Sequence, residues 1–215
     1  MRIDDLTLEV RDRNLKRVGQ VTPTFLNLKA TLRWCGVGEW TLTLPGDHPM
    51  VDYLVAEGSG VILIGPDGGV LPPATSDDAA WTETISRTIL SGPTLTPERK
   101  RDAQNPDGTY TFRGVTDEVH LADALAYPQP GNADVETQSA ANDVRTGAAE
   151  TLLRQFDDVN IGTGAPAGRR RGVRSKIAVA GADQTRGIEI TKSPRFQSLI
   201  ELLREIVLLD PSLGF

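Results

Sequence analysis

The chain has 215 residues, of which 39% are hydrophobic and 24% are charged, and its formal net charge is −6. This composition predicts a folded globular protein. It argues against a disordered chain and against a membrane protein, because no apolar run approaches the ~18 residues that a membrane helix needs. General nucleic-acid binders are basic over a whole domain, so the acidic balance argues against that class as well.

The first third of the chain has the two-residue periodicity of half-buried strands. Residues 6–11 alternate apolar and polar side chains, and residues 15–21 can pair back on them. Residues 25–34 and 39–45 form a second predicted hairpin, joined by a short segment with two glycines. Because both of these strands carry an apolar face, we expect two tryptophans in the core rather than on an aromatic ligand platform: Trp34 and Trp40.

A short helix and further strands are predicted next along the chain. Residues 49–58 begin with a proline that suits a first helical turn, and a buried strand follows at 60–65. Residues 84–93 and 109–115 indicate two more strands. The charged segment 96–108 between them has few apolar residues, so we expect it to be an insertion that points into solvent.

The composition changes at residues 127–138, which contain two prolines and a glycine and lack periodicity, as is typical of a linker. The period then becomes helical over 142–159. Residues 175–181 and 187–192 are predicted to pair as strands, and the apolar run 196–209 predicts a last helix.

These elements predict an α+β protein. A β-rich barrel or sandwich domain is expected at 1–126, a linker at 127–138 and a smaller α/β domain with two amphipathic helices at 139–215. Ser193 can cap the last helix, and Pro194 fits its first turn. The residues after this helix look like the entry to another strand, so we expect a longer parent protein.

The sequence contains no convincing catalytic or cofactor motif. Cys35 is the single cysteine, and neither His48 nor His120 lies in a nucleophile motif. Gly162 and Gly168 stand six residues apart, where a P-loop needs five. We therefore expect a protein that is not an enzyme, with no cofactor and no metal site, although a carboxylate pair brought together by folding stays open.

Charge is arranged in two adjacent blocks of opposite sign. Residues 117–158 hold nine acids against two arginines, and residues 159–182 hold five bases and no acid. Such blocks suit contact between chains or between parts of one chain; a solvated loop is the alternative, and nucleic-acid contact is a minor one. The candidate docking residues are these bases and the apolar face of the last helix: Arg169, Arg170, Arg171, Arg174, Lys176, Phe196, Leu199, Leu203 and Ile206.

Several stretches together resemble a known family. They are VRDRNLKRVGQV, ATLRWCGVGEWTLTLP, LVAEGSGVILIG, YTFRGVTDEVHLADALAYPQP, DVRTGAAETLLRQFDDVNIGTGAPAGRRR and SPRFQSLIELLREI. In order and spacing these blocks are similar to minor tail proteins of actinobacterial siphophages, of the type that forms the baseplate hub at the tail tip. The resemblance spans about residues 6–215 and corresponds to the N-terminal part of these longer proteins.

The resemblance implies a structural role in the virion, at the tail tip. Hubs of this type form a homotrimer whose tube-like β-domains make a pseudo-sixfold ring, and residues 1–126 would be the first such domain. The implied partners are the distal tail protein, the tape-measure protein, and tail fibres or receptor binders. The family supplies no catalytic residues.

Two other classes of function stay open. A receptor- or cell-wall-carbohydrate-binding module could use Trp34, Trp40 and Trp81 as sugar platforms. A cell-wall hydrolase is the less favoured alternative, because it would need a catalytic cluster.

Overall fold

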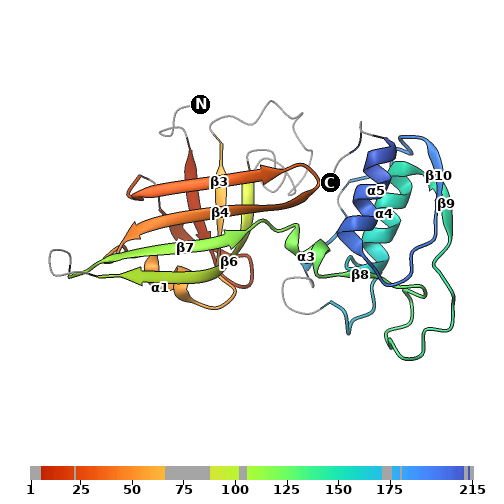
Figure 1. Ribbon diagram of the computed structural model, residues 1–215, viewed down its shortest axis with the longest axis horizontal. Helices are drawn as coiled ribbons and strands as arrows, with labels where there is room; N and C mark the ends of the chain where they lie inside the picture. Colours follow the sequence, from red (N-terminus) through yellow and green to blue (C-terminus); the bar gives the residue numbers. More distant parts are fainter. Residues whose placement is uncertain are drawn as a thin grey trace. The chain divides into compact units, whose positions relative to one another are not determined.

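The computed structural model describes residues 6–21, 23–65, 88–101, 106–170, 176–179, 181–210 and 213. The chain divides into two compact units, drawn with their elements in Figure 1. Unit 1 comprises Met1–Leu32 and Gly38–Asp117, and unit 2 comprises Arg33–Val37 and Glu118–Phe215.

Unit 1 is built on a seven-stranded sheet in the order β2-β1-β5-β6-β7-β4-β3, so β2 and β3 are its edges. The pairings of β1 with β2 and β5, of β6 with β5 and β7, and of β4 with β7 are antiparallel. The elements, which include one short helix, are β1 (Thr7–Arg11), β2 (Arg17–Gln20), β3 (Asn27–Arg33), β4 (Gly36–Pro45), α1 (Val51–Val55), β5 (Gly60–Ile64), β6 (Thr88–Lys100) and β7 (Thr109–Val115).

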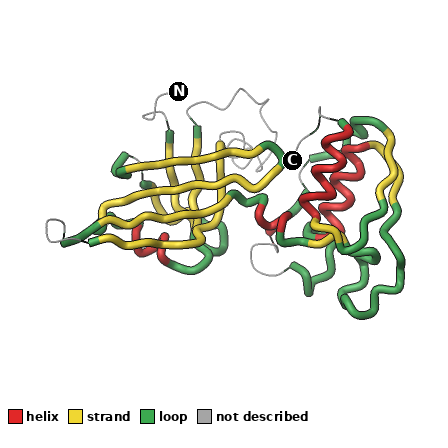
Figure 2. The backbone as a smooth tube through the Cα atoms, in the orientation of Figure 1, coloured by secondary structure: helices red, strands yellow, loops and turns green. Residues whose placement is uncertain are grey.

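The long strand β6 joins two halves of this sheet. Its first half pairs with β5 and its second half with β7, and the register shifts between Thr94 and Thr96. Figure 2 shows the two sets of strands running across one another. Leu8 and Val61 from one set share a buried cluster with Leu42 and Phe112 from the other. The sheet therefore folds over a single apolar core.

Glycines let the two halves approach closely at this bend. A Cβ on Gly92 would lie 1.8 Å from the carbonyl oxygen of Val115, and one on Gly114 would lie 2.3 Å from both the Trp40 ring and the Pro93 oxygen. No side chain fits at such distances, so glycine is required here for close approach rather than for an unusual φ.

Unit 2 is a small α+β body around two packed helices, α4 (Ala149–Asn160) and α5 (Leu199–Leu209), which lie side by side in Figure 1. β9 (Arg145–Ala148) pairs antiparallel with β10 (Glu189–Lys192), and β8 (Leu125–Ala126) with β11 (Gln197–Ser198). A short helix, α3 (Val119–Ala122), precedes β8. The largest fully buried side chain of this core is Phe156.

The division after Asp117 differs from the predicted domain boundary at 126 and from the predicted linker at 127–138. Ala124 and Ala126 are buried in the core of unit 2, and β8 pairs with β11 in the same unit. The tip of the β3–β4 hairpin, Arg33–Val37, also belongs to unit 2, and its Cys35 is buried in the core of that unit.

Both long helices begin later than the sequence predicts. Residues 145–148, expected as helix, form β9, and β10 pairs with it rather than with residues 175–181. The last helix begins at Leu199, beyond Ser193 and Pro194, because Gln197–Ser198 pairs with β8. At the start of α5 the N–H of Leu199 donates to the backbone oxygen of Ala124. A backbone oxygen next to β8, rather than a capping side chain, therefore satisfies this N–H group.

The charged segment after Pro93 is partly a strand rather than a solvent-pointing insertion. β6 continues to Lys100 and pairs with β7, and Glu98 forms an exposed ion pair with Arg113 of that strand. The Arg99 guanidinium lies over the Tyr110 ring, 5.0 Å from its centroid. A run of charged residues therefore occurs in a solvated strand as well as in a loop.

Candidate functional site

The glycine-rich stretch after α4 is a tight helix ending rather than a phosphate cradle. The Asp158 Oδ1 atom accepts hydrogen bonds from the Thr163 hydroxyl (2.9 Å) and from the N–H of Gly164 (3.0 Å). A Cβ on Gly162 would lie 2.6 Å from the Asp158 Cα. The carboxylate occupies the position that an anion would need, so the loop folds back onto its own helix.

Arg169, the first of the candidate docking arginines, binds within its own chain. Its guanidinium carbon lies 3.5 Å from the centroid of the Tyr127 ring. Its Nη1 donates to the Pro130 oxygen at 3.0 Å, and its Nη2 donates to the Asn132 oxygen. Burial lowers the pKa of Arg169 from its usual value, and the side chain stays cationic. The arginine thus fastens residues 127–138 to the end of α4.

Asn160 fixes the other side of this arrangement. It is only 2% exposed; its Oδ1 accepts from the N–H of Tyr127 at 3.0 Å, and its Nδ2 donates to the Phe156 oxygen at 2.8 Å. The Tyr127 ring also meets the Phe196 ring edge-on, with centroids 5.9 Å apart. No local sequence pattern connects Tyr127 with Asn160, which is why sequence reasoning missed both.

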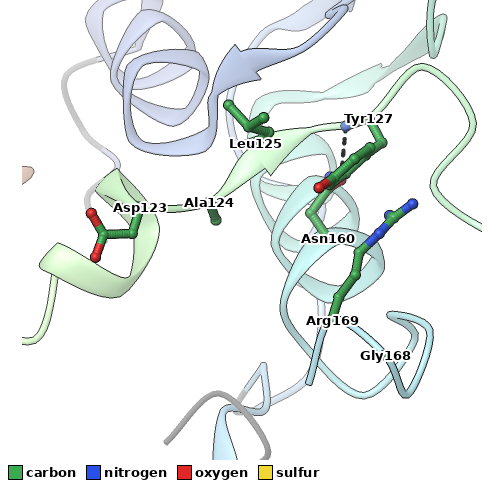
Figure 3. A pocket seen from close by; sticks show the side chains of 7 residues that line it. All are labelled: Asp123, Ala124, Leu125, Tyr127, Asn160, Gly168 and Arg169. Atoms are coloured by element: carbon green, nitrogen blue, oxygen red, sulfur yellow. Dashed lines mark hydrogen bonds between the residues drawn. The ribbon is translucent and has the colours of Figure 1, made fainter. Parts of the chain in front are cut away.

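A cavity of about 410 Å³ lies at this place, as Figure 3 shows. Its polar groups are a carboxylate, a guanidinium, a phenol and an amide, and the amide is already bonded to the backbone. These groups can hydrogen-bond and stack; among them there is no hydroxyl or thiol paired with a base for nucleophilic catalysis. The lining residues are Asp123, Ala124, Leu125, Tyr127, Asn160, Gly168 and Arg169.

Of the other candidate docking bases, the structure describes two, and they differ in exposure. Arg170 is half-buried and Lys176 is exposed, whereas Arg171 and Arg174 lie outside the described residues. The contact partners of Arg169 do fall within the acidic block 117–158, but they are backbone oxygens and a ring rather than carboxylates.

The apolar face of α5 lies in the core of unit 2. Leu199 and Ile206 are fully buried, and Leu203 is 2% exposed, all in the cluster that contains Phe156. Within the chain α4 packs against this helix, and the role of these side chains in assembly stays a prediction. Phe196 is half-buried against Tyr127.

Some of the exposed apolar side chains lie on strand β3 or next to its ends. Trp40 is 2% exposed as predicted, but Trp34 is 61% exposed, so its predicted burial is wrong. Leu26 and Leu32 are 58% and 57% exposed, and of the alternating apolar residues in the strand only Leu28 packs partly on the core. Apolar and polar residues alternate in the same way in an exposed edge strand as in a strand whose apolar face is buried. The sequence alone therefore does not distinguish the two cases.

Two carboxylates of α4 have shifted pKa values. A hydrogen bond from the Arg186 side chain is the main cause that lowers the pKa of Glu150 to about 2; Arg186 Nε lies 2.9 Å from Glu150 Oε2. Burial, with the neighbouring Asp158 charge as a second cause, raises the pKa of Asp157 to about 6. The Oδ1 of Asp157 is buried without a hydrogen-bond partner. The two carboxylates are seven residues apart on α4 and do not form an acid–base pair. Their shifted pKa values make the stability of the fold depend on pH.

The described part of the chain lacks two further kinds of feature. Within it, no three His, Cys, Asp or Glu side chains gather closely enough to hold a metal ion. None of the helices described is long and apolar enough to cross a membrane.

Comparison with known proteins identifies the class as a siphovirus protein, in agreement with the resemblance in the sequence. Residues 7–210 match the model of one family, and the chain belongs to it: the Siphovirus ReqiPepy6 Gp37-like protein family. No curated protein matches the sequence.

Proposed function

We propose that the chain is a structural component of the siphophage tail tip, a hub-like minor tail protein that joins the tail tube to host-contacting parts. The observation that carries this proposal is the family match over residues 7–210, which covers both units rather than a shared fragment. The antiparallel sheet of unit 1, folded over one core, gives a rigid body of the kind that a tube-like ring domain needs.

Binding surfaces in such a protein must lie on exposed side chains. In unit 1 the exposed apolar residues of β3 provide one, and in unit 2 Leu208 and Leu209 are 68% and 51% exposed. The proposed partners are other copies of the chain, in the trimer that the resemblance implies, together with the distal tail protein, the tape-measure protein and fibres or receptor binders.

Antibody labelling of virions tests the tail-tip location. Antibodies raised against the purified chain should decorate the tail tip in electron micrographs of the phage. Labelling of the head or along the tail shaft would overturn the proposal. So would the absence of labelled particles, if the same antibody binds the denatured chain from virions. Zymography on host peptidoglycan tests the accompanying proposal that the protein is not an enzyme, since a cleared band would contradict it.

A receptor- or wall-carbohydrate-binding module is the second candidate, and the exposed Trp34 ring favours it. Trp40 is core and cannot serve as a platform, and Trp81 lies outside the described residues. Host wall sugars should then quench tryptophan fluorescence, and Trp34→Ala should abolish the quenching. A structural hub predicts no such change.

A further inference from the structure

We infer that unit 1 carries a binding site for a neutral sugar, in a cavity between the β1–β2 turn and the residues that follow α1. The cavity has a volume of about 350 Å³, near the lower end of the range of ligand pockets. The site does not depend on the tail-tip location, which virion labelling tests separately. Its polar lining residues are Asp12, Arg13, Asn14, Tyr53, Glu57 and Ser59.

One wall of the cavity is the turn between β1 and β2, which is held by its own hydrogen bonds. The N–H of Asp12 donates to the Lys16 oxygen at 2.9 Å, and the N–H of Leu15 donates to the Asp12 oxygen at 3.0 Å. The Asp12 Oδ1 atom accepts from the N–H groups of Asn14 (2.8 Å) and Lys16 (2.9 Å). The backbone of this wall is therefore ordered before a ligand binds, which lowers the cost of binding.

The other wall, formed by α1 and the residues after it, lies against this turn. A Cβ on Gly58 would lie 2.7 Å from the Cβ of Arg13, so the two walls approach closely at this point. Ser59 is 1% exposed, and its hydroxyl donates to the Leu54 oxygen at 2.8 Å. Leu54 is itself buried in the core of unit 1, so this wall is anchored to that core.

Tyr53 supplies an aromatic ring to the cavity. Its side chain is 49% exposed, although it lies on a helix whose other residues Val51 and Leu54 are buried. An exposed tyrosine offers a flat apolar surface and a hydroxyl group at its tip. A pyranose ring has C–H groups on its faces and hydroxyl groups around its edge. A sugar can therefore pack on the Tyr53 ring while its hydroxyl groups reach the polar side chains beside it.

The charges around the cavity favour a neutral ligand. Arg13 and Glu57 are both exposed and line the same cavity, yet within the described part of the chain neither takes part in an ion pair. A cationic ligand would meet the Arg13 guanidinium, and an anionic ligand would meet the carboxylates of Asp12 and Glu57, so each sign is repelled by one side. A hydroxyl group both donates and accepts, and it can bond to the guanidinium and to the carboxylates alike.

Titration of the isotope-labelled chain, followed by NMR, tests the site. The probes are methyl β-glucoside, methyl β-galactoside and N-acetylglucosamine. At least one of them should shift the amide signals of residues 12–16 and 53–59. The dissociation constant should be on the order of 1 mM, because an exposed site leaves part of the sugar in water. No shift with any probe, or shifts confined to other residues, would contradict the inference.

Substitutions at exposed aromatic residues locate the sugar. Tyr53→Ala should raise the dissociation constant more than about tenfold, whereas Tyr53→Phe keeps the ring and should keep most of the affinity. Trp34→Ala is the matched control, because Trp34 is also exposed (61%), and it should change nothing. Unchanged circular dichroism will show that these surface variants still fold. Loss of binding in Trp34→Ala rather than in Tyr53→Ala would assign the sugar to Trp34 and overturn this site.

Charge variants and charged probes test whether the ligand is neutral. Glu57→Gln removes the charge and keeps an acceptor oxygen, so it should bind the sugar nearly as well as wild type does. Free lysine and free glutamate, which carry both signs of charge, should leave the signals of the cavity unchanged. Binding of either amino acid without any sugar, lost in Glu57→Gln, would show an ionic site and overturn the inference.

Discussion

At the residue scale, Asp157 is a half-buried carboxylate that the fold stabilises poorly. Its Oδ1 has no hydrogen-bond partner, and its pKa is raised from 3.8 to about 6. A carboxyl group whose pKa is higher in the folded state makes no contribution below pH 3.8, where both states hold the proton. The free energy of unfolding falls as the pH rises from there to about 6, and the whole penalty is present above that pH.

Asp157→Asn should therefore stabilise the protein at pH 7.5 by up to roughly 3 kcal/mol, at 1.36 kcal/mol per pKa unit, and leave it unchanged near pH 3.5. Urea unfolding at the two pH values measures the difference. Asp158→Ala is the control and should destabilise, since it removes the Oδ1 atom that accepts hydrogen bonds from Thr163 and Gly164. Equal stabilisation by Asp157→Asn at both pH values would show that the charge is not the cause.

Glu150 shows the opposite linkage. Its pKa is lowered from 4.5 to about 2 by Arg186, so its contribution to stability is complete above pH 4.5 and is lost as the pH falls toward 2. Glu150→Gln should lower the melting temperature at pH 7 and flatten its dependence on pH between 4.5 and 2. The curve of wild type minus variant, taken by thermal melting, isolates this group from other carboxylates. A difference that stays constant across this window would exclude the titration of Glu150.

At the element scale, the bend between the two halves of the sheet depends on glycine. Gly114→Ala should destabilise the chain by about 3 kcal/mol or more, because the added methyl would meet the Trp40 ring and the Pro93 oxygen, both held in the packed core. Gly131→Ala is the control, with nothing within 4 Å of the new Cβ. Denaturant unfolding followed by tryptophan fluorescence measures both. Near-equal stability of the two variants would mean that the bend relaxes freely.

Arg169 and its loop form a second element-scale feature. The Arg169 guanidinium stacks on Tyr127 and donates to the Pro130 and Asn132 oxygens. Arg169→Ala removes these contacts, so it should expose residues 127–138 to protease. It should also lower stability by about 1–3 kcal/mol, since two partly buried carbonyl oxygens lose a charged donor. Lys176→Ala, at an exposed base, should change neither. If both variants resist protease as wild type does, the arginine is not what holds the loop.

Some elements could be predicted from the sequence and others could not, for reasons that differ by position. β1, β4, β5 and β7 were predicted because their apolar residues face a covered core, so periodicity and burial agree. The starts of α4 and α5 were predicted too early because residues before them pair with distant strands, which local pattern does not contain. The exposure of Trp34 and the contact of Arg169 with Tyr127 likewise depend on which segments become neighbours.

At the scale of the whole molecule, the chain has two cores. Leu42 and Phe112 belong to the cluster of unit 1, and Phe156 and Leu203 belong to the cluster of unit 2. Each cluster is contiguous and gains its burial energy within its own unit. The chain should therefore unfold in two steps rather than one, since two-state behaviour is typical of single domains.

The substitutions above can assign the two steps. In calorimetry at pH 7.5, Gly114→Ala should lower the transition of unit 1 alone, and Asp157→Asn should raise that of unit 2 alone, because the two sites belong to different units, each with its own core. The double variant should show both shifts at their single-variant sizes. The segment Arg33–Val37 is continuous with strands of unit 1, yet it buries Cys35 in the core of unit 2. One transition that both substitutions move would show that this segment couples the two cores into one cooperative unit.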